Sequence, residues 1–264
     1  YLSNILKNIR AKYFDTILIF KCENLSSTDL EKLRYNNPNS KLILYLWDSE
    51  IRIRNISSKY KFFDAIHSFD RDDCLKNESI IFTPLFYRNE IDNIKLTPTK
   101  FNLYHLGWKH SDRYELLKKI ELILINNNLK YKFFLYTGFL DFINEVLRHK
   151  FHVNSFFLTI KKKSFFQHIQ YLSDSEVVLD ISHPNQSGLT IRTIEAIAAR
   201  KKIITTNKNI TSYDFYCSQN ILVIDREHVK IPIDFFKKPF KEIEDEIIQN
   251  YSLSSWTKKV LNED

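Results

Sequence analysis

The residues best suited to chemistry stand in one segment, residues 177–202, which reads VVLDISHPNQSGLTIRTIEAIAARKK. Residues 177–181 predict a short strand, a polar loop follows over residues 182–188, and a helix is expected to begin near Thr190. The beginning of a helix offers unpaired backbone N–H groups and the positive end of a dipole, which together suit a phosphate. Gly188, one of three glycines in the chain, stands at this junction, where a backbone can approach a ligand closely.

Several side chains around this helix start have both a functional and an ordinary interpretation. Ser187 and Thr190 can contact a phosphate or cap the helix, and both roles use the same N–H groups. Arg192 can bind a phosphate through two parallel hydrogen bonds, or lie solvated at the surface. Glu195, about a turn and a half inside the helix, can accept both hydroxyls of a ribose, or lie solvated beside an apolar stripe. From the residues alone, these alternatives stay open.

Candidate general bases stand at other predicted strand ends. Asp48 follows one strand, and His110 lies in the loop after Gly107; His67 and Asp70 hold a similar place and rank lower. Attack by a hydroxyl nucleophile needs a base that takes its proton, and histidine titrates near neutrality. The ordinary interpretations are a helix N-cap for Asp48 and a loop histidine without a role for His110.

Strands and helices alternate along most of the chain, which predicts parallel βαβ units. A polar stretch over residues 90–100 is expected to link two doubly wound halves. Ligands of such sheets bind outside the carboxyl ends of the strands, so the loops after Leu46, Phe69, Leu106 and Ile181 are expected to surround one cleft. The expected strands are residues 16–20, 41–46, 65–69, 79–82, 101–106, 131–136, 177–181, 202–206 and 221–224; the expected helices are residues 28–35, 57–63, 70–75, 113–126, 141–148, 164–172, one from about 190, 240–250 and 254–261.

Composition narrows the classes of function. The 264 residues carry 39 basic and 32 acidic side chains, and the net charge of +7 suits an anionic partner or reflects only abundant lysine. Aromatic residues make up 14% of the chain but fall mostly on predicted strands and helices, so core packing explains them better than nucleic-acid stacking. No Walker, GxGxxG or GxSxG motif is present, which argues against ATPase, dehydrogenase and hydrolase activity.

Cysteine and histidine usage gives no sign of a metal. The three cysteines are far apart, which argues against disulfides and a cysteine zinc site and favours a reducing cytoplasm. His183 has no second histidine or cysteine at ligand spacing, so no metal is expected. No apolar run approaches the ~18–20 residues of a membrane span. The sequence begins with Tyr1 and contains no methionine, so the natural start is expected to be missing.

The segment SDSEVVLDISHPNQSGLTIRTIEAIAARKKIITTN, residues 173–207, resembles the nucleotide-sugar segment of GT-B glycosyltransferases. More narrowly, it resembles the bacterial surface-polysaccharide group called CgeB-like. The runs LILYLWDS, FDAIHSFDRDD and FTPLFY in the first half are similar to the same group. The resemblance implies an α/β fold of two Rossmann-like domains, with the active site between them and no metal or other cofactor. Members of this group normally have a strand and a helix before TILIF, so the N-terminal domain is expected to be truncated.

The resemblance also implies roles for particular residues. Glu195 matches the family glutamate that binds the ribose hydroxyls, and Gly107 with the loop to Arg113 matches a loop that often flanks the phosphates. The diphosphate-binding loop and helix start match Ser187, Gly188, Leu189 and Thr190. Many retaining members carry a second glutamate eight residues before the first, where this sequence has Ser187, which weakens the case for a retaining mechanism and leaves the inverting and retaining alternatives open.

Together these features predict an N-terminal acceptor-side domain over residues 1–95 and a C-terminal nucleotide-sugar domain over residues 96–264. The expected function is metal-independent transfer of a sugar from a nucleotide diphosphate sugar to a hydroxyl of a lipopolysaccharide, capsule or O-antigen glycan, free or lipid-linked. The protein is expected in the cytoplasm, with peripheral contact at the inner membrane and no nucleic-acid partner. The alternatives are a sugar-nucleotide epimerase of similar architecture and a catalytically inert nucleotide-binding or scaffold module.

Overall fold

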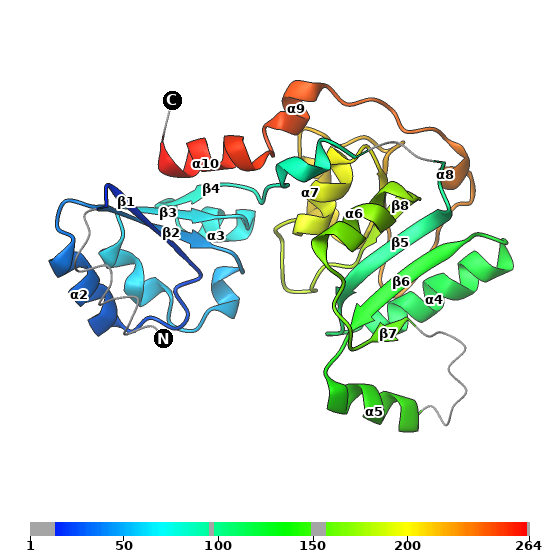
Figure 1. Ribbon diagram of the computed structural model, residues 1–264, viewed down its shortest axis with the longest axis horizontal. Helices are drawn as coiled ribbons and strands as arrows, with labels where there is room; N and C mark the ends of the chain where they lie inside the picture. Colours follow the sequence, from blue (N-terminus) through cyan, green and yellow to red (C-terminus); the bar gives the residue numbers. More distant parts are fainter. Residues whose placement is uncertain (1–13, 95–97, 149–156, 263–264) are drawn as a thin grey trace. The chain divides into compact units, whose positions relative to one another are not determined.

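The computed structural model describes residues 14–94, 98–148 and 157–262 (Figure 1). These residues form two compact units. The first comprises the described residues up to Leu85, Gln186–Gly188, and the residues from Ser254 on; the second comprises Phe86–Asn185 and Leu189–Leu253. The domain boundary predicted between residues 95 and 96 lies outside the described residues.

The first unit is built on a parallel sheet of four strands in sequence order, β1-β2-β3-β4. The strand β2 reads KLILYL and is buried along all but its first residue, as expected for a strand covered on both faces. A capping box between Ser26 and Asp29 begins α2. The elements are β1 (Thr16–Phe20), α2 (Ser27–Asn36), β2 (Lys41–Leu46), η1 (Glu50–Arg52), η2 (Ser57–Phe62), β3 (Ala65–Ser68), α3 (Arg71–Lys76) and β4 (Ile80–Phe82).

A helix from late in the chain completes the first unit. This helix, α10 (Leu253–Leu261), places Trp256 against the aromatic side chains of the sheet. The ring of Trp256 lies 4.8 Å from that of Tyr45 and 5.9 Å from that of Phe20, measured between centroids. Trp256 is only 5% exposed, so its indole is part of the core of this unit.

The second unit is built on a parallel sheet of six strands in the order β10-β9-β8-β5-β6-β7. Along the chain, β5, β6 and β7 follow one another from the centre of the sheet toward one edge. The strands β8, β9 and β10 then run from the centre toward the other edge. The order therefore reverses between β5 and β8, which is the switch point of a doubly wound sheet. The strands are β5 (Phe101–Trp108), β6 (Tyr131–Tyr136), β7 (Leu158–Thr159), β8 (Ser175–Asp180), β9 (Lys202–Thr205) and β10 (Ile221–Val223); the helices are η3 (Asn89–Ile91), α4 (Arg113–Asn126), α5 (Phe139–Arg148), α6 (Phe165–Ser173), α7 (Ile191–Ala198), η4 (Lys208–Ser212), α8 (Asp234–Lys237) and α9 (Asp245–Gln249).

Side chains alternate between the two faces of this second sheet. Leu103 and Val177 form one core with Leu117 of α4, and all three are fully buried. The alternating neighbour Tyr104 points to the opposite face, where its hydroxyl contacts His168 of α6. Figure 1 shows α6 and α7 beside β8, and α4 beside β6. The two parallel α/β sheets confirm the predicted fold class.

The end of the chain differs from the prediction of one helix over residues 240–250. Only Asp245–Gln249 is helical, because the side-chain amide of Asn220 fixes the backbone of Lys241: it donates to the Lys241 carbonyl at 2.7 Å and accepts the Lys241 N–H at 2.7 Å. The structure also contains α8 and β7, which were not predicted, and residues Ser57–Phe62 form a 3-10 helix. Across the parts of the chain that the structure describes, no helix is long and apolar enough to cross a membrane.

Candidate functional site

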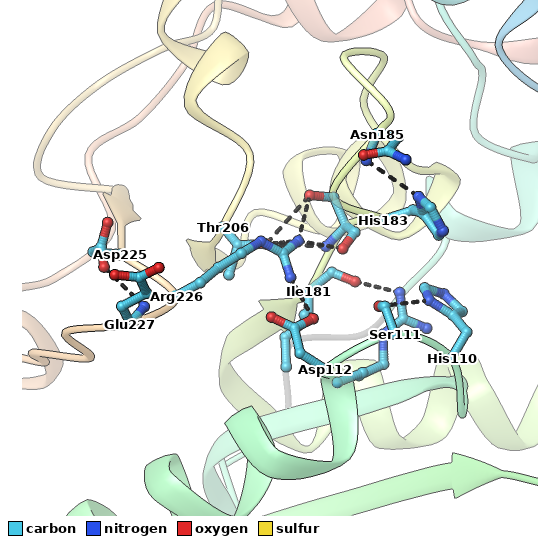
Figure 2. Close-up of polar contacts among 12 residues, drawn as sticks. His110, Ser111, Asp112, Ile181, His183, Asn185, Thr206, Asp225, Arg226 and Glu227 are labelled. Carbon is cyan, nitrogen blue, oxygen red and sulfur yellow. Dashed lines mark hydrogen bonds and ion pairs between the residues drawn. The ribbon is translucent and has the colours of Figure 1, made fainter. Parts of the chain in front are cut away.

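The loops that follow β5, β8, β9 and β10 meet at the carboxyl edge of the second sheet (Figure 2). The switch point between β5 and β8 lies at this edge, and parallel sheets bind ligands at such a point. His110, Asp112, His183, Thr206 and Arg226 all come from these loops. In Figure 2, Arg226 reaches toward Asp112 and Thr206, and the rings of His110 and His183 lie to the right of them. We therefore treat this edge of the second unit as the candidate site.

Gly107 and Arg113, both predicted from sequence, lie together beneath the site. The Arg113 guanidinium donates to the carbonyls of Trp108, at 2.8 Å, and Ile181, so it ties the end of β5 to the end of β8. A Cβ on Gly107 would lie 2.7 Å from Nη1 of Arg113, so glycine leaves the space that this guanidinium fills. Burial lowers the pKa of Arg113 to about 10, and the side chain keeps its positive charge at neutral pH.

A second arginine, Arg226, joins the site from the loop after β10. Its guanidinium donates to Asp112 at 2.7 Å, to the hydroxyl of Thr206 at 3.0 Å, and to the carbonyl of Ser182 (Figure 2). Arg226 was not predicted from sequence. Its position could have indicated it, because Arg226 follows the strand expected over residues 221–224. Ligands of parallel sheets bind at the carboxyl ends of the strands.

His110, one of the two predicted bases, lies beside His183. The ring centroids are 5.3 Å apart, and Nδ1 of His110 lies 3.1 Å from the hydroxyl of Ser111. Nδ1 of His183 accepts the backbone N–H of Asn185 at 3.2 Å, so the proton of neutral His183 is on Nε2. From the sequence, His183 had been weighed only as a metal ligand. No cluster of three potential metal ligands exists among the residues with described positions.

The residues at the start of α7 form a helix cap. Thr190 is the N-cap of α7, and its hydroxyl oxygen accepts the N–H of Thr193. The hydroxyls of both threonines donate to Oδ2 of Asp180 at the end of β8, at 3.0 and 2.7 Å. Leu189 is buried beside them, with 2% of its surface exposed. The capping interpretation of Thr190 therefore holds, while the predicted phosphate contact of this helix start stays a prediction.

Ser187 and Gly188 belong with the first unit. The backbone N–H of Ser187 donates to Asp70 at 3.1 Å, and the Ser187 hydroxyl donates to the other carboxylate oxygen. A Cβ on Gly188 would lie 2.5 Å from the ring of Phe69, so no larger residue fits. The glycine at this position is thus required by close packing against Phe69, a contact that the sequence did not reveal.

Asp48, the other predicted base, follows β2 in the first unit. Its carboxylate forms ion pairs with Lys21 and with Arg52, the latter at 3.3 Å. The N-cap of the following 3-10 helix is Ser49, so the alternative role of Asp48 as a cap is wrong. The side chain is 22% exposed, which leaves part of the carboxylate accessible to solvent.

Glu195 is buried in the second unit, with its side chain 2% exposed. Its Oε2 accepts from Nε2 of His168 at 3.0 Å and from the Arg192 guanidinium, whereas Oε1 has no hydrogen bond to any residue that the structure describes. Burial would raise the pKa of Glu195, but the hydrogen bond from His168 and the charge of Arg192 together hold it below its usual value. A solvated surface glutamate, the ordinary interpretation, is therefore wrong.

Comparison with known proteins identifies the fold. No family model and no curated protein matches the chain. Among solved structures, the chain is similar to TarM (TM-score 0.65, 16% identity, 99% of this chain and 57% of that one) and to AviGT4, a glycosyltransferase involved in avilamycin A biosynthesis (0.62, 10%, 99% and 76%). It is also similar to a putative UDP-N-acetylglucosamine 2-epimerase from Listeria monocytogenes (0.54, 13%, 98% and 76%).

These likenesses and the two parallel sheets define the chain as a protein of the GT-B fold. The chain spans 57% of the length of TarM. The reaction, the substrates and the roles of individual residues are therefore matters for proposal.

Proposed function

We propose that the protein is a glycosyltransferase that moves a sugar from a nucleotide diphosphate sugar to a hydroxyl of a growing surface glycan. The observation that carries this proposal is the switch point of the second sheet, where a helix start, the charged Arg113 and the acidic Glu195 belong to adjoining elements. The GT-B fold, shared with the glycosyltransferase AviGT4, supports the same class.

In the proposed reaction, a hydroxyl oxygen of the acceptor bonds to the anomeric carbon as the bond from that carbon to the diphosphate oxygen breaks. The acceptor proton passes to a base, for which Asp48 and His110 are the candidates. The nucleoside diphosphate leaves with the bonding electrons. Backbone N–H groups at the start of α7, together with Arg113, which stays charged at neutral pH, would stabilise the negative charge that develops on the diphosphate, without a metal.

Glu195 is proposed to position the nucleoside through the ribose hydroxyls. Its Oε1 is the oxygen that has no partner among the described residues, so it is the natural acceptor for a ribose hydroxyl. Arg192 would either bind a phosphate of the donor or move away from Oε2 of Glu195. The Glu195 side chain is 2% exposed and that of its partner Arg192 is 31% exposed, so we propose that Arg192 moves when the ribose binds.

The proposed acceptor is a lipopolysaccharide, capsule or O-antigen glycan, in free or lipid-linked form. The net charge of +7 supports peripheral contact with an anionic membrane surface. A sugar-nucleotide epimerase is the second candidate, favoured by the likeness to the Listeria protein. An epimerase would interconvert its sugar nucleotide without an acceptor, whereas a transferase releases one nucleoside diphosphate for each sugar transferred.

The first test is a thermal-shift panel of UDP, GDP, CMP, ADP and dTDP on the wild type and on Glu195→Ala. The proposal expects one nucleotide to raise the melting temperature of the wild type and not that of the variant. Donor turnover is then measured with the sugar derivatives of that nucleotide. Binding without any release of diphosphate would replace the transferase by an inert binding module, and no shift with any nucleotide would remove the donor site altogether.

A further inference from the structure

A line of three buried side chains stands behind the carboxylate of Glu195. The hydroxyl of Tyr104, on β5, lies 2.9 Å from Nδ1 of His168, on α6. Nε2 of the same imidazole lies 3.0 Å from Oε2 of Glu195, on α7. The exposed fractions of the three residues are 0%, 2% and 2%, so this line is shielded from solvent along its whole length.

The direction of the hydrogen bonds along this line is fixed by which groups hold protons. Burial raises the pKa of the Tyr104 phenol far above neutrality, so its O–H donates to Nδ1 of His168. Burial also lowers the pKa of His168, so the imidazole is neutral and carries its single proton on Nε2. That N–H donates to the Glu195 carboxylate, and the Tyr104 bond thereby selects the tautomer that can make it.

The consequence is a carboxylate with one oxygen engaged and one available. Oε2 accepts from both His168 and Arg192, and Oε1 accepts from no described residue. A carboxylate held by a buried donor cannot rotate without breaking that bond, so Oε1 keeps a fixed direction. A fixed acceptor of this kind distinguishes a ligand hydroxyl from a hydrogen atom in the same place, because the ligand without the hydroxyl leaves the acceptor unpaired.

We propose that His168 and Tyr104 are positioning residues that hold Glu195 for a ribose hydroxyl, so that the site selects ribonucleoside diphosphate donors over their deoxy counterparts. This inference rests on the proposed function. Neither residue was singled out from the sequence, and neither contacts the donor in this proposal. Their effect passes through the carboxylate of Glu195.

The experiment compares, in one titration series, the nucleotide that the wild type binds among UDP, GDP and ADP with its 2′,3′-dideoxy analogue. The ratio of the two dissociation constants is measured for the wild type, Glu195→Ala, His168→Phe and Tyr104→Phe. A hydrogen bond to a charged acceptor predicts a ratio of about 10 or more in the wild type. We expect the ratio to approach 1 in Glu195→Ala and His168→Phe and to fall several-fold in Tyr104→Phe.

Tyr171→Phe is the matched control, because Tyr171 stacks against Tyr104 with 5.7 Å between centroids and has no hydrogen bond to His168 among the contacts described. It should keep the wild-type ratio. Tyr104→Phe removes only a hydroxyl, so its ratio of dissociation constants tests the inference if His168→Phe does not fold. Equal losses of affinity for the ribo- and dideoxynucleotides in the folded variants would show a purely structural role and overturn the inference, while the proposed function stands. Binding of dTDP but of no ribonucleotide would overturn this inference and leave the proposed function standing. Failure of the wild type to bind any nucleotide of the full thermal-shift panel would overturn both.

Discussion

Arg226 and Asp112 form an ion pair across the carboxyl edge of the second sheet, with 2.7 Å between Nη1 and Oδ1. Asp112 is the N-cap residue of α4, yet its side chain makes no cap hydrogen bond and binds Arg226 instead. The same guanidinium binds Thr206 and the carbonyl of Ser182. One side chain thus links four loops, and the geometry of the candidate site depends on it.

Replacing Arg226 by alanine should loosen these loops. Arg226→Ala removes the donors from the Ser182 carbonyl and the Thr206 hydroxyl and is expected to lower stability by about 1–2 kcal/mol, less than a fully buried network because Asp112 is 40% exposed. Unfolding in urea measures this loss. The control is Lys237→Ala, which removes only an exposed ion pair with Asp234 and should cost no more than about 0.5 kcal/mol. An Arg226 variant no less stable than this control would contradict the assigned role.

A methyl group at Gly107 should disturb Arg113. Gly107→Ala places a carbon 2.7 Å from Nη1 of Arg113 and 3.0 Å from Nε2 of His105, so the guanidinium must leave its carbonyl partners. We expect a loss of about 1–3 kcal/mol, as for other overpacked sites. Gly138→Ala is the matched control, since its nearest atom is Oδ2 of Asp141 at 3.7 Å. Thermal unfolding of the two variants compares them directly, and equal melting temperatures would refute the steric argument.

The cap at the start of α7 should contribute measurably to stability. Thr190→Ala removes the acceptor of the Thr193 N–H and a donor to Asp180, and is expected to cost about 1 kcal/mol. Thr190→Ser keeps a hydroxyl at the same place and should retain most of that stability. Chemical denaturation of both variants makes the comparison. A serine variant as unstable as the alanine variant would assign the effect to the lost methyl group.

The stability of the first unit should depend on pH through Asp73. Burial, followed by the neighbouring Asp70 and Glu50 carboxylates, raises the pKa of Asp73 to about 6. Because this pKa is above the unfolded value of 3.8, protonation favours the folded state. The stabilisation is full below about pH 4 and is lost as the pH rises through about 6, at most about 3 kcal/mol in all.

Asp73→Asn tests this dependence because an amide cannot ionise. Melting temperatures measured between pH 4 and pH 7.5 should fall less steeply for this variant than for the wild type. Asp72→Asn, at the exposed neighbouring position of α3, should keep the wild-type slope. Parallel curves for Asp73→Asn and the wild type would show that this carboxyl does not set the pH dependence.

The sequence was sufficient to predict the alternation of strands and helices and the helix that carries Glu195. Those features depend on local periodicity, which is present in a run such as KLILYL or in the stripe formed by Ile191, Ile194 and Ala198. The end of the chain was harder because residues 240–244 are not helical, and the backbone of Lys241 is held by the side chain of Asn220, 21 positions away. No local pattern contains such a contact.

For the candidate site too, the sequence indicated some of the residues but not the partners that they contact. Glu195, Gly107 and Arg113 were chosen because the resemblance to GT-B glycosyltransferases matched them to family positions, while their structural partners depend on tertiary contacts. His168 meets Glu195 from 27 positions away, and Arg226 meets Asp112 from 114 positions away. The interpretation of Gly188 also changed, since the close neighbour that requires glycine is the ring of Phe69.

The position of Trp256 has a consequence for the order in which the protein can fold during synthesis. Its indole packs with Tyr45 and Phe20 inside the first unit, although the whole second unit is translated between them. During synthesis on the ribosome, part of the aromatic surface of the first sheet therefore stays uncovered until α10 has been translated. A stalled or shortened nascent chain would expose that surface to chaperones, and a version of the first unit expressed alone would need α10 joined to it by a new connection.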